Sequence, residues 1–100
     1  MEKKSPHYDL GTIKKVFSTA SALRITRTAL STAEAVGLTL EDIVRLIQGI
    51  VRPHFYKSMT SHADHRIWQD VYHVPWGDIA LHVKFTVDAE GYLVISFKEK

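Results

Sequence analysis

The fold is decided by the stretch Ile79-Ala80-Leu81-His82-Val83-Lys84-Phe85-Thr86-Val87. Large apolar side chains occupy the odd positions, and smaller or polar side chains occupy the even ones. Successive side chains of a β-strand point to opposite faces, so this alternation predicts a strand with one buried face and one open face. The second half of the chain is therefore expected to form a sheet with an apolar side and a polar side.

Three further stretches have the composition of strands, and we predict strands at Phe55–Thr60, Ile67–Val74 and Tyr92–Lys98. Polar or turn-forming segments separate the four strands, at Ser61–Arg66, Pro75–Asp78 and Asp88–Gly91. The resulting order of strand and turn is that of an antiparallel meander.

In both of the last two strands the apolar side chains fall on odd-numbered residues. Paired residues of neighbouring strands lie on the same face, so the two residue numbers of each pair must add up to an even number. Val87 then faces Gly91 or Leu93, and His82 faces Ser96 in the first register or Lys98 in the second. His82 and Lys98 are direct or diagonal neighbours in both registers, within about 8 Å of each other.

The first half of the chain has the helical period instead. We predict helices over 9–20, over 27–36 and from residue 40 to no further than Pro53. Asp9, Thr26 and Thr39 are suitable N-caps, and Gly37 suits the end of the second helix. Helices followed by a meander predict an α+β fold, with three N-terminal helices packed on one face of a C-terminal antiparallel sheet. A length of 100 residues suits a single domain over 1–100.

Composition narrows the class of protein. The chain has no cysteine, which excludes disulfides and thiolate chemistry and favours a reducing compartment. It has no apolar run of the roughly 20 residues that a membrane helix needs, and residues 1–7 do not resemble a secretory signal. We therefore expect no membrane contact and a cytoplasmic location.

The polar side of the sheet is the candidate site. His82 and Lys84 share it with Ser96 and Lys98. In the strand predicted at Phe55–Thr60, one face carries Lys57 and Met59, and the other carries Tyr56, Ser58 and Thr60. In the strand predicted at Ile67–Val74, Gln69 and His73 share a face. The alternation leaves the orientation of these two strands open.

These residue types suit RNA cleavage without a metal. Attack by a ribose 2′-hydroxyl needs a base, a proton donor for the leaving 5′-oxygen, and positive charge at the phosphate. Histidine or a lysine of lowered pKa can exchange protons, and lysine can supply the charge. We expect no cofactor and no metal.

Several blocks of the sequence carry a specific resemblance. Phe55-Tyr56-Lys57-Ser58-Met59-Thr60, Ile67-Trp68-Gln69-Asp70-Val71-Tyr72 and Ser96-Phe97-Lys98-Glu99-Lys100 closely resemble the MqsR toxin family, and the resemblance covers essentially the whole chain. It implies a RelE-like fold and a ribosome-independent mRNA endoribonuclease that prefers short GC-containing triplets, leaves 2′,3′-cyclic phosphate and 5′-hydroxyl ends, and inhibits translation and growth. It also implies a cognate antitoxin that contains zinc and binds DNA. The toxin would then contact operator DNA only through this antitoxin.

The resemblance implies functional roles for Lys57, Met59, Gln69 and Lys98. His82 stands where the family pattern has tyrosine, so the role of that tyrosine does not transfer unchanged. Histidine titrates near 6.5 and tyrosine near 10. Either Lys57 or His82 could be the general base. We predict Lys57, Gln69, His82 and Lys98 as catalytic, and as substrate contacts Met59, Tyr56, His73, His65 and Lys84.

Three alternatives remain. His62, Asp64 and His65 could begin a zinc site, although no further ligand follows at a typical spacing. The protein could bind nucleic acid without cleaving it, or could extend the sheet of a partner through a strand edge. An RNA cleavage assay separates these possibilities.

Overall fold

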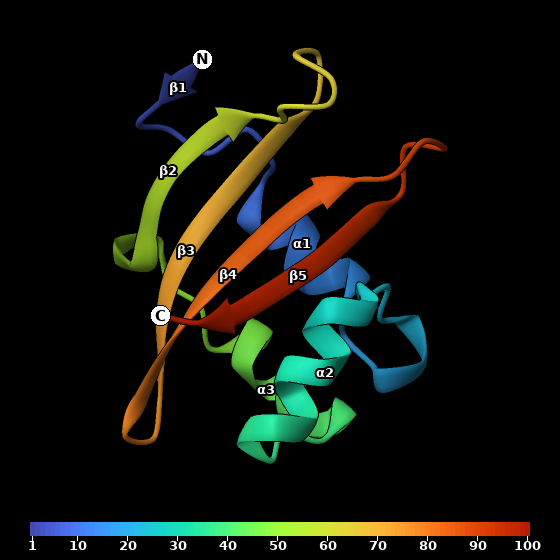
Figure 1. The fold of residues 1–100 in the computed structure, drawn as a ribbon, viewed down its shortest axis with the longest axis vertical. Coiled ribbons are helices and arrows are strands. Elements are labelled where there is room, and N and C mark those ends of the chain that lie inside the picture. Colours follow the sequence, from blue (N-terminus) through green and yellow to red (C-terminus); the bar gives the residue numbers. More distant parts are fainter.

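The computed structural model describes residues 1–100 and shows an α+β protein (Figure 1). Three α-helices are present, namely α1 (Leu10–Val16), α2 (Arg27–Val36) and α3 (Leu40–Gln48). One antiparallel sheet has the order β1 (Glu2–Lys3), β2 (Phe55–Thr60), β3 (Trp68–Trp76), β4 (Ile79–Val87) and β5 (Leu93–Glu99). Short 3₁₀ turns lie at Ala20–Ala22 and Arg52–His54. The α+β class predicted from the sequence is confirmed.

The hairpin of β3 and β4 is longer than predicted. The expected turn at Pro75–Asp78 is wrong, because Pro75 pairs with Ala80 and Trp76 with Ile79. Only Gly77 and Asp78 form the turn, and Gly77 has the positive φ of 58° that such two-residue turns favour. Pro75 is tolerated because β2 pairs with β3 only as far as Tyr72, so this part of β3 is a local edge.

The strand pairings also decide the register left open by the sequence. Val87 pairs with Leu93, and His82 therefore faces Lys98. The outer edge of β5 is partly covered by the segment before α2, since Ile25 forms a parallel bridge with Ile95. At the opposite edge, β1 pairs with β2. Strand β1 was not predicted from the sequence.

Local signals explain where the helices begin and end. Helix α2 has the predicted bounds, with the Thr26 side chain accepting from the N–H of Ala29 and Gly37 left-handed at the end. Thr39 is the N-cap of α3, as expected, and forms a capping box with Asp42. Helix α1 begins after Asp9 as expected but ends at Val16, short of the predicted residue 20. Ser18 and Thr19 follow, and their hydroxyls compete with helical hydrogen bonding.

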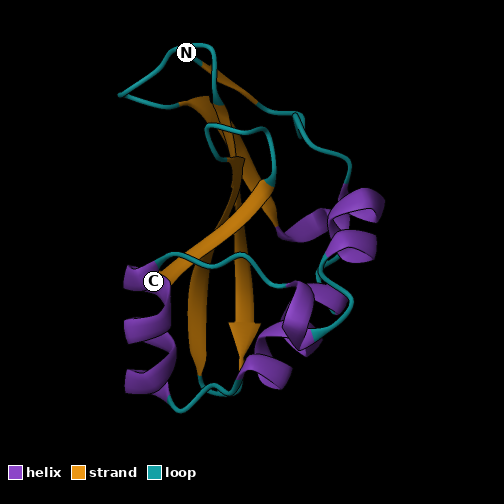
Figure 2. Ribbon diagram, turned by 90° about the vertical axis from the view of Figure 1, so that its right-hand side faces the viewer, coloured by secondary structure: helices purple, strands orange, loops and turns teal.

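The hydrophobic core takes side chains from all three helices and from one face of β3, β4 and β5. Ile13, Phe17 and Ile47 contribute from the helical half, while Val83 and Phe85 contribute from β4. Figure 2 shows the helices beside the sheet and away from the N-terminal strand. None of the helices combines the length and the apolar character needed to cross a membrane.

Candidate active site on the polar face of the sheet

The sheet surface opposite the core gathers nearly all the predicted site residues. We call this surface the polar face, and it consists of Tyr56, Lys57, Met59, Gln69, His73, His82, Lys84, Ser96 and Lys98. The register resolves the orientation of β3, since Asp70, Tyr72 and Val74 are buried on the other side. The polar face is open, with no enclosed pocket in the structure.

One row of the polar face centres on two histidines. His73 of β3 faces His82 of β4, which in turn faces Lys98 of β5. The two imidazole centroids are 5.2 Å apart, with the ring planes tilted by 45°. Neither ring forms a hydrogen bond with the rest of the chain, so their nitrogen atoms are available to a ligand.

Tyr56 completes this row through an irregularity in β2. The alternation placed Tyr56 on the face opposite Lys57, but the pairing shifts between Phe55 and Lys57. This β-bulge lets Tyr56 stack on His73, with ring centroids 4.4 Å apart and planes 22° from parallel. The expectation that Tyr56 and Lys57 face opposite sides is therefore wrong.

Lys57 occupies the next row, in which Val71 of β3 separates it from Lys84 of β4. Both pair with Val71 across the sheet. The Nζ atom of Lys57 lies 2.7 Å from Oε1 of Glu2, which β1 brings to this edge. The hydrogen bond from Lys57 lowers the pKa of Glu2, and the same bond raises the pKa of Lys57. Lys57 is therefore held in its protonated form.

The third row holds Met59 and Gln69, which face each other across β2 and β3. The Gln69 amide makes no hydrogen bond to the chain, so both its donor and its acceptor remain available. A thioether next to a free amide can pack against the flat face of a base while the amide bonds to its edge.

The two histidines have lowered pKa values. Partial burial lowers the pKa of His82, and the positive charges of His73, Lys98, Lys84 and Lys57 lower it further. Burial also lowers the pKa of His73, with a contribution from Lys100. Both imidazoles are consequently mostly neutral at neutral pH, as a proton acceptor must be.

On the opposite face, β3 carries a buried carboxylate that the sequence analysis did not single out. Asp70 is 0% exposed. It accepts hydrogen bonds from the N–H groups of His7 (2.9 Å) and Tyr8 (2.8 Å) and from the Ser58 hydroxyl (2.6 Å). It thereby fixes the segment that leads from β1 to α1. A charge among apolar core positions was the signal that could have revealed this role.

Tyr72 is the exception on that side. Its buried hydroxyl has no hydrogen-bond partner. Burial raises the pKa of Tyr72 to about 12, and the nearby Asp70 carboxylate adds to the shift. The phenol is therefore neutral and belongs to the core, where its ring meets Phe55 and Phe85 edge-on.

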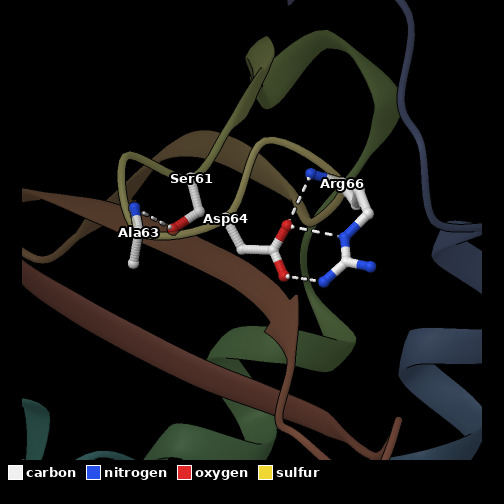
Figure 3. A network of polar contacts seen from close by, with 4 residues as sticks. All are labelled: Ser61, Ala63, Asp64 and Arg66. Carbon is white, nitrogen blue, oxygen red and sulfur yellow. Dashed lines mark hydrogen bonds and ion pairs between the residues drawn. The ribbon is translucent and has the colours of Figure 1, made fainter.

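His65 lies away from these rows, in the loop that joins β2 and β3. Figure 3 shows how this loop is fixed: Arg66 binds the Asp64 carboxylate, and the N–H of Ala63 donates to the Ser61 hydroxyl. The Arg66 bonds lower the pKa of Asp64 to about 2. The chain has no group of three histidine, cysteine or acidic residues placed to hold a metal ion, so His62, Asp64 and His65 are not gathered as a set of ligands.

Fold and site together define a small α+β protein with a cationic, histidine-bearing sheet face. The sequence model of the family described as motility quorum-sensing regulator, toxin of MqsA, matches residues 5–99. The mRNA interferase toxin MqsR of Escherichia coli (strain K12) is 42% identical over 100 residues, which cover 100% of both chains. The chain belongs to the MqsR toxin family, as its sequence blocks predicted.

Proposed function

We propose that this protein is a toxin of a toxin–antitoxin pair that cleaves mRNA as an endoribonuclease. The name of the Escherichia coli relative, an mRNA interferase toxin, supports this activity. The observation that carries the proposal is the row of His73, His82 and Lys98 beside Lys57 on one open surface. This surface combines neutral imidazoles with ammonium groups, the two kinds of group that metal-free cleavage of RNA requires.

In the proposed reaction His82 is the general base and takes the proton of the ribose 2′-hydroxyl. Its lowered pKa keeps it neutral at neutral pH, whereas the raised pKa of Lys57 makes that lysine a poor base. Lys57 and Lys98 stabilise the negative charge that develops on the phosphate. Gln69 orients the phosphate or a base, and Met59 packs against a base. The products are a 2′,3′-cyclic phosphate and a 5′-hydroxyl.

The remaining parts of the proposal come from the family. The protein would act in the cytoplasm on mRNA free of the ribosome, would prefer short GC-containing triplets, and would inhibit translation and growth. A cognate zinc-containing DNA-binding antitoxin would neutralise it and link it to operator DNA. One domain over 1–100 would carry these activities in a RelE-like arrangement, with the helices packed on one face of the sheet.

Cleavage of a purified mRNA, with mapping of the new ends, tests the proposal. We expect cleavage to proceed in full with EDTA present, to leave 5′-hydroxyl ends, and to fall at least about 100-fold in Lys57→Ala. Full activity in a triple variant with Lys57→Ala, Gln69→Ala and His82→Ala would contradict the assigned site. Binding of RNA without cleavage by the unaltered protein would favour a non-catalytic binding module.

A further inference from the structure

The polar face presents two histidines to the same small area. His73 and His82 are direct cross-strand partners, and their ring centroids are 5.2 Å apart. The tilt of 45° between the rings means that they do not stack face to face. One phosphodiester can therefore lie against the edges of both rings.

His73 is held in place from the other side. Tyr56 stacks on its imidazole at 4.4 Å, and the β-bulge in β2 is what brings Tyr56 to this face. The stacking contacts use the ring faces and leave the ring nitrogen atoms free. No hydrogen bond within the chain occupies them, so a proton on His73 can be passed to a ligand.

We propose that His73 is the general acid of the cleavage reaction, acting opposite the base His82. This inference rests on the proposed ribonuclease function and extends it, because a residue first assigned to substrate contact becomes a catalytic one. The 2′-oxygen forms a bond to phosphorus while its proton passes to His82. The bond between phosphorus and the 5′-oxygen breaks, and that oxygen takes a proton from His73. The next cycle needs only the return of one proton from His82 to His73 through water.

The lysines of the polar face are poorer donors for this step. An ammonium group titrates near 10.4, far above the pH at which the reaction runs, and the bond to Glu2 raises the pKa of Lys57 further. A donor transfers its proton most effectively when its pKa lies near the working pH. Imidazole meets that condition, and His73 is the imidazole that faces the base.

The pair also predicts the pH dependence. The charged and titratable groups around it are Tyr56, Lys57, Lys84, Lys98 and Lys100. Burial and these cations lower the pKa of both histidines, and protonation of one disfavours protonation of the other. The productive form has one proton on the pair. It is lost at low pH, when both rings are charged, and at higher pH, when both are neutral. We expect a bell-shaped profile of kcat/KM with its maximum on the acid side of neutrality.

The decisive experiment replaces the leaving oxygen by sulfur. An RNA oligonucleotide is made with a 5′-thio linkage at a cleavage site mapped with the unaltered protein. A thiol titrates near 8.5, so a thiolate leaves without a proton. We expect His73→Ala and His73→Phe to lose at least about 100-fold on the oxygen substrate but to stay within about threefold of the unaltered protein on the sulfur substrate. His73→Phe keeps an aromatic ring beside Tyr56 and removes the ring nitrogens that carry the proton.

His82→Ala is the matched control, since loss of the base should slow both substrates alike. An equal loss for His73→Ala on the two substrates, or no loss on either, would overturn the assignment of the general acid. Retention of the alkaline limb of the pH profile in His73→Phe would overturn it as well. Failure of the unaltered protein to cleave either oligonucleotide would instead overturn the proposed function, and the inference with it.

Discussion

The polar side chains on the two faces of β3 differ in whether they form hydrogen bonds within the protein. On the buried face, Asp70 accepts hydrogen bonds from two backbone N–H groups and from Ser58. On the polar face, Gln69 and His73 make no hydrogen bond to the chain. Side chains only one to three positions apart in one strand thus differ completely in how many hydrogen bonds the protein itself gives them.

The difference separates groups that stabilise the fold from groups left for a ligand. A buried polar atom must be paired within the protein, because leaving it unpaired costs about 1–3 kcal/mol. A half-exposed amide or imidazole can be paired by water until a ligand replaces it. Substitutions on the buried face should therefore change stability, and substitutions on the polar face should change activity.

The largest expected effect is on the polar face. His82→Ala should slow RNA cleavage by about 100- to 10,000-fold, because the proposed general base is lost. The free energy of unfolding should change by only about 0.5 kcal/mol or less, since no hydrogen bond inside the chain is removed. Single-turnover cleavage and urea unfolding measure the two quantities. A large loss of stability without a loss of cleavage would contradict the assignment of stability to the buried face and of activity to the polar face.

The next effect is on the buried face. Asp70→Ala should lower the free energy of unfolding by about 3–5 kcal/mol, because two N–H groups and a hydroxyl lose their acceptor. Urea denaturation followed by circular dichroism measures this. Native hydrogen exchange at His7 and Tyr8 should speed up in the same variant. Unchanged stability would show that Asp70 is not the anchor of this segment.

Ser58→Ala tests one bond of the same network. It should cost about 1.5 kcal/mol of unfolding free energy, since the hydroxyl donates to a buried carboxylate. Gln69→Ala is its matched partner on the polar face and should leave stability within about 0.5 kcal/mol of the original. Equal costs for the two variants, measured by urea unfolding, would remove the distinction between the faces.

The smallest effect concerns Glu2, the one acid that pairs with the polar face. Glu2→Gln should tighten the binding of single-stranded RNA by about threefold at low salt, because Lys57 is then free to meet a phosphate. A 2′-O-methyl oligonucleotide, which lacks the nucleophile, allows this measurement by fluorescence anisotropy. Glu34→Gln on α2 makes the same change in net charge and should have no such effect. Weaker binding in Glu2→Gln would mean that the acid positions the lysine instead.

The parts of the fold that the sequence predicted have strong local signals. Thr26 and Gly37 mark the ends of α2, and the alternation in Ile79–Val87 marks β4. The neighbourhood of His82 and Lys98 followed from phase alone, because a shift by one residue would expose every apolar side chain of the strand. These features depend on residues close in sequence or on one clear pattern.

The parts that escaped prediction depend on distant partners. Strand β1 has too few residues to show any period, yet it brings Glu2 to Lys57. Tyr56 faces His73 only because the pairing of β2 slips by one position. Pro75 remains in a strand because no β2 residue lies beside it. No local pattern records where a neighbouring strand stops or bulges.

The row from His73 to Lys98 has a consequence for the timing of synthesis. The ribosome adds β5 after every other strand, and Lys98 cannot meet His82 until β5 has paired with β4. The bond between Glu2 and Lys57 likewise spans 55 positions and must wait for a late, long-range closure. The polar face is therefore complete only when β1 and β5, the two edges of the sheet, have both paired with their neighbours.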